Sequence, residues 1–235
     1  SGSNWLFRAE TYYKHFENLI TLNQGEQVTE GNDQVSTTPF NEFFDTRAFA
    51  YGLELLFKKT AGKSRGWIGY TYAKTMKHIQ KHGWYYPKYD RTHTVNIVGD
   101  ITMPFFKNLH FNYAVQASSG QPFTPPIGRY NHFEVYHDPL GSDLYQNEQF
   151  LVGEKNADRL PIYFRLDLGL KQKKSLFGVP YERYLQLINV TNHVNPLSYQ
   201  YRAKKNRLTG EALGLERAAV PMFPFFFTVG YRIEL

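Results

Sequence analysis

The sequence of 235 residues contains no cysteine, which excludes a disulfide framework and any zinc site built on thiolates. It also lacks a run of about 18 consecutive apolar residues, the length that a membrane helix needs. This second absence excludes a helical membrane protein. It does not exclude a membrane β-barrel, because barrel strands alternate apolar and polar residues. A secretory signal peptide is not visible, and Ser1–Ser3 is typical of a cloning remnant or a cut end.

Charge is moderate and mixed in sign. The chain carries 27 basic and 21 acidic residues, for a net charge of +6. The basic residues are scattered among acidic ones, and the single dense run, Arg202–Arg207, lies in an expected loop, so we do not expect nucleic-acid binding. Aromatic residues make up 17% of the chain, which is high for a soluble protein, although the charge content alone would describe one.

The closing segment has a period of two, which is typical of a strand with one apolar and one polar face. Its apolar positions are Phe225, Phe227, Val229, Tyr231, Ile233 and Leu235. The same alternation predicts eight strands in all: Trp5–Tyr13, Tyr51–Lys58, Trp67–Tyr72, Thr94–Met103, Leu109–Ser118, Ile162–Lys171, Tyr184–Tyr201 and Phe225–Leu235. In the seventh, the alternation slips at Ile188, as a β-bulge would cause.

The connections between these strands alternate between short and long. The short ones are Thr60–Ser64, Pro104–Lys107 and Lys173–Pro180, and the long ones are about Asn23–Thr46, Met76–Asp90, Ser119–Asp158 and Ala203–Val220. In an antiparallel up-and-down sheet this order places all short turns at one end and all long loops at the other. Transmembrane barrels sort their loops in this way.

Lipid explains the apolar faces better than a protein core does. Ten strand residues extend about 33 Å, and when tilted they span the roughly 25 Å apolar band of an outer-membrane barrel. The opposite faces carry ionisable residues: Arg8, Glu10, Glu54, Lys58, Asp100, Arg165, Asp167, Lys171, Arg232 and Glu234. The sequence therefore predicts an all-β fold, an antiparallel up-and-down transmembrane β-barrel with about eight strands in one membrane domain, residues 1–235.

Several segments resemble the C-terminal part of the TonB-dependent receptors of bacterial outer membranes. They are Ala9–Ile20, Tyr51–Lys59, Gly66–Thr75, Tyr89–Val98, Tyr113–Pro125, Arg159–Leu170, Leu187–Pro196 and the closing strand. The most specific pieces are DRTHTVN, SSGQPFTP and RLPIYFRLD. The closing strand resembles the signal read by the barrel-assembly machinery, although it ends in Leu235 where many such signals end in Phe or Trp.

The resemblance implies energised uptake of a scarce, bulky nutrient, such as an iron chelate, a cobalamin or a glycan, at the outer membrane of a Gram-negative-type bacterium. Members of the family have a 22-stranded barrel, an internal plug and an N-terminal box that engages TonB. This sequence contains no counterpart of the plug or the box, so its eight strands correspond to the last third of such a barrel. The expected partners are outer-membrane lipid, the assembly machinery, and the remaining strands and plug (or a partner chain). TonB would be reached only through the plug.

Ligand contacts are expected in the long loops, where aromatic and histidine residues gather. The candidates are Trp84, Tyr85, Tyr86, Arg129, Tyr130, His132, Phe133, Tyr136 and His137. They could stack against an aromatic chelate or a sugar ring. Tyr85 and Tyr86 could instead belong to an interfacial aromatic girdle, the interpretation favoured for Tyr13, Tyr70, Tyr72 and Tyr231.

We expect no catalytic residue, no metal site and no cofactor. His110 and Ser118 share one strand face, but eight residues of strand separate them by about 26 Å, and His93 is interpreted as structural. His78 and His82, like His132 and His137, are interpreted as solvated loop histidines, because nothing indicates a helix that would bring either pair onto a metal. Asn189–Thr191 matches a glycosylation acceptor, which we interpret as coincidence.

Two alternatives remain open. The chain could form a self-contained eight-stranded outer-membrane barrel with a structural, adhesin or small-pore role, its narrow lumen filled by side chains. It could also be a soluble β-sandwich that binds carbohydrate. An upstream plug sequence would separate the first from the receptor, and dependence on detergent would separate both from the sandwich.

Overall fold

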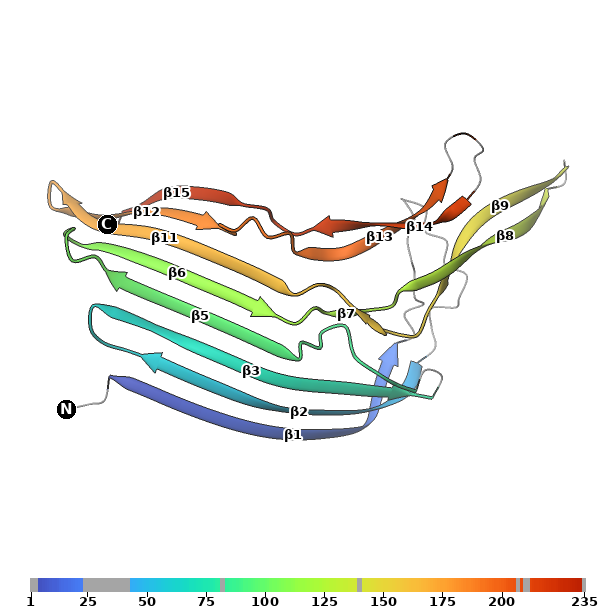
Figure 1. The fold of residues 1–235 in the computed structure, drawn as a ribbon, viewed down its shortest axis with the longest axis horizontal. Helices are drawn as coiled ribbons and strands as arrows, with labels where there is room; N and C mark the ends of the chain where they lie inside the picture. Colours follow the sequence, from blue (N-terminus) through green and yellow to red (C-terminus); the bar gives the residue numbers. More distant parts are fainter. Residues whose placement is uncertain are drawn as a thin grey trace.

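The computed structural model describes residues 4–22, 43–80, 83–138, 141–205, 208 and 212–233. The described residues contain strands and no helix. Nine strands form one antiparallel sheet, and eight of them lie side by side in the order in which they follow along the chain, with the ninth, β4 (Gly83–Tyr85), paired to the end of β3 (Figure 1). In order, the eight are β1 (Trp5–Leu22), β2 (Phe43–Lys59), β3 (Ser64–Ile79), β5 (His93–Thr102), β6 (Leu109–Ser118), β11 (Tyr163–Leu176), β12 (Val179–Ile188) and β15 (Phe226–Ile233). These are the eight strands predicted from alternation, so the all-β antiparallel prediction is confirmed.

The seventh predicted strand is wrong in its second half. We predicted one strand over Tyr184–Tyr201 with a bulge at Ile188. The strand instead ends at Ile188, because Asn189 has a left-handed φ of 51° that no extended strand adopts. The chain then forms a separate hairpin of β13 (Pro196–Lys205) and β14 (Ala212–Pro221).

The long connections also hold more strand than expected. The connection between β6 and β11 contains β7 (Pro122–Phe123), β8 (Pro126–Asp138), β9 (Gly141–Val152) and β10 (Asp158–Arg159). Strand β4 (Gly83–Tyr85) pairs with the end of β3. The loop expected at Lys173–Pro180 is instead the tip of a hairpin whose ladder continues to Leu176 opposite Val179. The range expected as a loop over Asn23–Thr46 is strand at its C-terminal end, where β2 begins at Phe43, and residues 23–42 lie outside the described part.

Short turns and long connections lie at opposite ends of the sheet, as predicted. Figure 1 shows both chain termini and the turns β2–β3, β5–β6 and β11–β12 at its left end. The β8–β9 and β13–β14 hairpins lie at the right end, where the long connections leave the sheet.

The ladders place the apolar residues of neighbouring strands on one shared face. Phe7 is opposite Phe57, which is opposite Ile68, and the row continues through Ile97, Val115 and Leu166. A second row runs through Leu168, Leu187 and Phe227. We call this the apolar face. The closing strand presents Phe227, Val229, Tyr231 and Ile233 on it, each more than 60% exposed, while Leu235 lies outside the described residues.

The opposite face, here called the charged face, carries the ionisable residues that alternation predicted. Glu10 is opposite Glu54, Arg65 is opposite Asp100, and Glu182 is opposite Arg232. Two tyrosines on this face lie over glycines of the neighbouring strand, Tyr12 over Gly52 and Tyr184 over Gly230. A methyl group on either glycine would collide with the tyrosine ring, so glycine is what allows the rings to lie flat on the sheet.

The described part of the chain has almost no hydrophobic core. Its buried apolar residues are Ala48, Ile79, Tyr85 and Leu160. The chain exposes 16950 Å², whereas a compact protein of 27.5 kDa exposes about 11,000 Å² by the usual scaling. The excess arises because the sheet is a single layer that no other described element covers.

Both edges of the sheet are open within the described residues. β1 pairs only with β2, and β15 pairs only with β12, so these strands do not meet to close a barrel. Figure 1 places β1 and β15 at opposite edges. None of the described elements is a helix long and apolar enough to cross a membrane.

Candidate functional site

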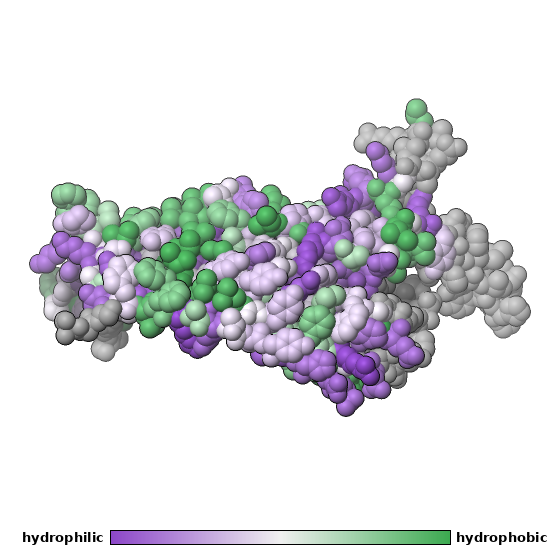
Figure 2. Space-filling model, turned by 60° about the horizontal axis from the view of Figure 1, so that its bottom comes forward, coloured by the Kyte–Doolittle hydropathy of each residue, from purple (hydrophilic) through white to green (hydrophobic). Residues whose placement is uncertain are grey.

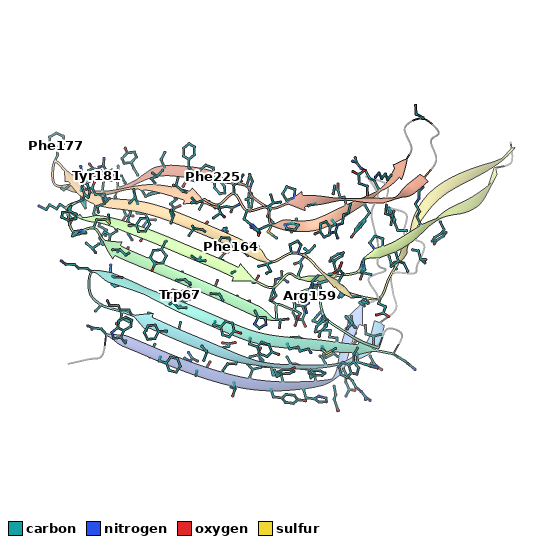
Figure 3. The ribbon with its side chains drawn as sticks, in the orientation of Figure 1. Trp67, Arg159, Phe164, Phe177, Tyr181 and Phe225 are labelled. Atoms are coloured by element: carbon teal, nitrogen blue, oxygen red, sulfur yellow. The ribbon has the colours of Figure 1, made fainter. Side chains whose placement is uncertain are left out.

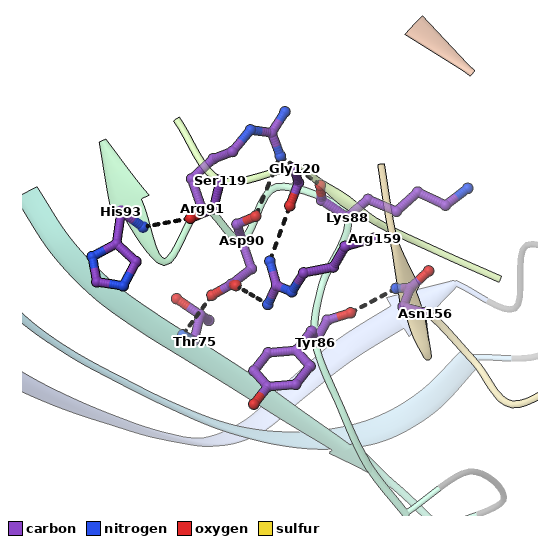
Figure 4. Close-up of polar contacts among 10 residues, drawn as sticks. All are labelled: Thr75, Tyr86, Lys88, Asp90, Arg91, His93, Ser119, Gly120, Asn156 and Arg159. Atoms are coloured by element: carbon purple, nitrogen blue, oxygen red, sulfur yellow. Dashed lines mark hydrogen bonds and ion pairs between the residues drawn. The ribbon is translucent and has the colours of Figure 1, made fainter. Parts of the chain in front are cut away.

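Two long connections are joined to the sheet by a buried carboxylate at the end where the loops leave. The Asp90 side chain is 1% exposed and accepts a bond from Arg159 Nη2 at 2.6 Å. Its other oxygen accepts the backbone N–H of Thr75 in β3 at 2.9 Å. Arg159 Nη1 donates to the Gly120 carbonyl at 3.1 Å (Figure 4). We call Thr75, Tyr86, Asp90, Gly120, Asn156 and Arg159 the loop-base cluster.

An aromatic ring and a buried amide complete the cluster. The Arg159 guanidinium carbon lies 4.8 Å from the centroid of the Tyr86 ring, a cation–π geometry that favours the charged side chain. Asn156 donates to the Tyr86 carbonyl at 2.7 Å, and its backbone N–H donates to Thr124 Oγ1 at 3.0 Å. The cluster therefore fixes the end of the connection to β5 and both the beginning and the end of the connection from β6 to β11.

A third connection reaches the same region through Arg91. Its Nη2 donates to Gln121 Oε1 at 2.7 Å, and Gln121 Nε2 donates to the Leu197 carbonyl at 3.3 Å. Partial burial lowers the pKa of the Arg91 guanidinium, and the positive charge of Arg159 lowers it further, while Asp90 opposes both. The guanidinium stays protonated near neutral pH because its ordinary pKa is far higher.

A second buried polar group forms where β12 ends. Asn189 is fully buried, and its side-chain amide donates to the carbonyls of His193 at 3.0 Å and Phe223 at 3.3 Å. Its Oδ1 accepts the His193 N–H at 3.2 Å, and its own N–H donates to Asp167 Oδ1 at 3.0 Å. Because this amide is buried and bonded, it is not available for glycosylation, in line with our interpretation of Asn189–Thr191.

Asn195 makes a parallel arrangement one strand away. Its amide donates to the Phe164 carbonyl at 2.8 Å and accepts the Phe164 N–H at 2.9 Å. It therefore replaces, for one residue of β11, the backbone partner that β12 no longer supplies. We call Asn189 and Asn195 the asparagine clamp.

The three aromatic candidates on and after β4 do not form one surface. Trp84 lies on the apolar face, with ring centroids 5.1 Å from Phe49 and 5.1 Å from His78. Tyr85 points to the other face, is buried, and lies beneath Lys155 Nζ at 5.3 Å. Tyr86 belongs to the loop-base cluster, with Lys74 Nζ 5.6 Å from its ring. Lys74 and Arg159 thus both approach this ring.

The other ligand candidates lie on β8, in the hairpin that extends beyond the sheet (Figure 1). Tyr130 is 48% exposed and Arg129 is half-buried. His132, Phe133, Tyr136 and His137 lie on the same strand, and their side chains are outside the described set. The sequence predicted a loop here, and a β-hairpin is what the structure has; the predicted ligand role itself is neither supported nor contradicted.

The charged face has a hollow of about 990 Å³ near the short-turn end. Asp100 is one of the lining residues. Its carboxylate accepts a bond from Arg65 Nη2 at 3.1 Å and lies 3.1 Å from His110 Nδ1 and 4.0 Å from Lys171 Nζ. Lys58, Glu182 and Arg232 also line the hollow. Trp67, Val98 and Ile188 add apolar surface, so the lining is mixed in character.

Two histidines considered as catalytic candidates, His93 and His110, each have a side-chain partner. His93 Nδ1 lies 2.9 Å from the Tyr70 hydroxyl, and its ring stacks on that of Tyr70 and is tilted against that of Tyr72. His110 is paired with Asp100. Across the described ranges, no three histidine or carboxylate side chains converge as metal ligands would.

The loop-base cluster and the asparagine clamp were not predicted from sequence. Asp90 lies in DRTHTVN, Arg159 in RLPIYFRLD, and both asparagines of the clamp in LINVTNHVNP, which are pieces that carried the family resemblance, whereas Tyr86 and Asn156 lie in none of them. The signal was therefore present as motif content, but pairing Asp90 with Arg159 across 69 residues requires the sheet register. Comparison of the chain with protein-family models, with curated proteins and with solved structures finds no match.

Proposed function

We propose that this chain supplies eight adjacent strands of an outer-membrane receptor or transporter barrel of the TonB-dependent type. Such a barrel takes up a scarce, bulky nutrient: an iron chelate, a cobalamin or a glycan. The observation that carries the proposal is the apolar face, which runs without interruption across eight strands and has no described element packed on it. Water is a poor solvent for so large an apolar surface, and the hydrocarbon layer of a membrane is a good one.

The distribution of polarity along the strands agrees with this placement. In the view of Figure 2, apolar side chains gather in a patch over the left half, and hydrophilic side chains predominate toward the lower right. Aromatic pairs lie toward both ends of the strands: Trp5 stacks on Phe57 at 4.9 Å near the short turns, and Phe49 approaches Trp84 at 5.1 Å toward the long loops. Aromatic belts at the two interfaces are a property of barrels.

Participation in a larger barrel is supported by the open edges. The backbone groups along the free sides of β1 and β15 have no strand partner in the described structure, and unpaired backbone is not tolerated in hydrocarbon. Further strands on both sides would satisfy these groups and would enlarge the lumen beyond what eight strands enclose. A larger lumen is what passage of a bulky nutrient needs.

In this proposal the long-loop end faces the outside and holds the ligand. The loop-base cluster supports it by fixing the course of two connections, and Tyr130 on β8 is an exposed aromatic residue placed beyond the sheet. The charged hollow around Asp100 faces the lumen, where a plug or water would cover it.

A self-contained eight-stranded barrel is the second candidate, because β1 and β15 run antiparallel and could pair with each other. The difference in length between β1, with 18 residues, and β15, with 8, weighs against it, since much of β1 would remain unpaired.

Folding of the purified chain in detergent micelles, followed by gel mobility with and without boiling, separates these proposals. If the chain is part of a larger barrel, it forms no compact, heat-modifiable species when it is alone. It forms such a species when the remaining strands of the barrel are supplied. A compact species from the chain alone would replace the receptor with the small barrel. Folding as a monomer in plain buffer would contradict both.

A further inference from the structure

The β11–β12 hairpin closes with a two-residue turn, Phe177–Gly178, in which both residues have positive φ, 50° and 84°. This geometry matches the strand twist and is normally occupied by Asn-Gly or Asp-Gly. Phenylalanine is unfavourable at the first position, because its Cβ crowds the following carbonyl in the left-handed region. An aromatic residue is therefore present here against the local preference of the backbone.

No packing against the described residues explains this choice. The Phe177 side chain is 98% exposed, and Figure 3 shows it at the tip of the turn, at the end of the molecule where the short turns lie. The neighbouring turn between β5 and β6 carries two more exposed rings, Phe105 at 91% and Phe106 at 58%. Exposed phenylalanine on adjacent turn tips indicates that something outside the chain covers them.

The hairpin surface next to Phe177 has the chemistry of a lipid–water interface. Tyr181 lies on the apolar face with its ring 6.5 Å from that of Tyr231, and Lys174 is its cross-strand partner. Aromatic rings prefer the headgroup layer, and lysine there is attracted to lipid phosphate. Phe177 continues this surface past the last ladder pair, beyond the point where the apolar face ends.

We propose that Phe177 is an interfacial anchor, whose ring lies in the lipid headgroup layer at the short-turn end. The inference rests on the proposed function. Lipid is a better occupant than a protein partner, because the three exposed rings of the two turns offer about 600 Å², at about 200 Å² each, which is below the roughly 800 Å² per partner of a specific protein interface. Insertion of the ring into the headgroup layer offsets the backbone strain at Phe177.

The absence of cysteine allows a direct test. A single nitroxide label is attached through Phe177→Cys in the chain folded in phosphatidylethanolamine–phosphatidylglycerol vesicles, together with whatever strands its folding requires. Its depth is measured from collision with oxygen against a water-soluble nickel chelate. Phe227→Cys on the apolar face and Glu154→Cys in the exposed connection before β10 provide the membrane and water references.

The expected result is an intermediate depth at position 177, between the two references, with collision by the nickel chelate several-fold lower than at position 154. If the label at position 177 is fully accessible to the chelate while the label at position 227 lies in hydrocarbon, the anchor proposal is contradicted and the proposed membrane barrel is not. Water at both 177 and 227 would overturn the proposed function itself. A label at 177 that is immobile yet outside the lipid would assign the turn to a protein partner and reject the lipid anchor.

Discussion

Asp90 is the residue on which the arrangement of two long connections depends. Its carboxylate is almost completely buried and is shared between the backbone of β3 and Arg159. Removing one member of such a pair leaves the other charge poorly solvated. Because Arg159 keeps 30% of its side chain exposed, water compensates for part of that loss.

We predict that Asp90→Ala lowers the free energy of unfolding by about 3 kcal/mol, toward the lower end for broken buried pairs. Urea titration of the folded protein in micelles measures it. Glu216→Ala, which removes the exposed pair with Arg202, is the matched control and should leave the midpoint unchanged. Equal effects of the two variants would mean that Asp90 has no special role.

Asn189 combines a left-handed backbone with a buried, fully bonded amide. Asparagine tolerates this conformation better than alanine, and truncation would leave the His193 N–H without its acceptor. We predict that Asn189→Ala costs about 3 kcal/mol, adding buried unsatisfied groups to backbone strain. The exposed neighbour Thr191→Ala should be neutral in the same urea titration. A neutral Asn189→Ala would show that the end of β12 is specified elsewhere.

Little of this residue-scale detail follows from sequence alone. The slip in alternation at Ile188 marked the right place, but its cause is a left-handed asparagine that ends the strand, and a slip in pattern does not distinguish that from a bulge. The Asp90–Arg159 pair is equally inaccessible, because a single sequence does not say which of 27 basic residues meets a given carboxylate.

At the scale of the strand, period-two alternation predicted the element and the face together. In β11, Phe164, Leu166, Leu168 and Leu170 share the apolar face, while Arg165, Asp167 and Lys171 share the charged one. The hairpin β8–β9 was missed because its residues 129–138 mix polar and aromatic side chains on both faces, so the pattern resembles a loop. Pairing with β9, not an apolar face, identifies it as strand.

The assignment of faces gives a prediction for β5. Ile97 lies mid-strand on the apolar face, opposite Ile68 and Val115. We predict that Ile97→Lys destabilises the protein folded in vesicles by about 2–4 kcal/mol, the cost of a lysine on the lipid face near the bilayer midplane. Asn96→Lys, one residue away on the charged face, should cost little. Chemical unfolding in vesicles measures the destabilisation by each variant. A larger loss of stability in Asn96→Lys than in Ile97→Lys would mean that the two faces are assigned the wrong way round.

At the scale of the whole molecule, the loop lengths alone predicted how the chain is arranged. Alternating short and long connections place the turns at one end and the loops at the other, and Figure 1 has this arrangement. Closure could not be predicted in the same way, because pairing between edge strands leaves no mark in the alternation of either strand. The open edges at β1 and β15 instead motivate the proposal of a larger barrel.

The large accessible area of the chain reflects a single-layer sheet. A single-layer sheet with an exposed apolar face has too little buried surface to be stable in water by itself. In the function proposed above, lipid covers the apolar face and water or polar protein covers the charged face, and the sheet takes its stability from both.

The measurement that tests this claim most directly is a single-cysteine nitroxide scan along residues 164–171 of β11, with the protein reconstituted in lipid vesicles. Strand β11 has partners on both sides, so the result does not depend on how the edges are closed. We predict that the collision rate of the label with oxygen alternates with a period of two and is high at Phe164, Leu166, Leu168 and Leu170. Accessibility to the water-soluble nickel chelate should be high at the residues between them. Uniform access to the chelate at all eight positions would contradict a lipid-facing sheet.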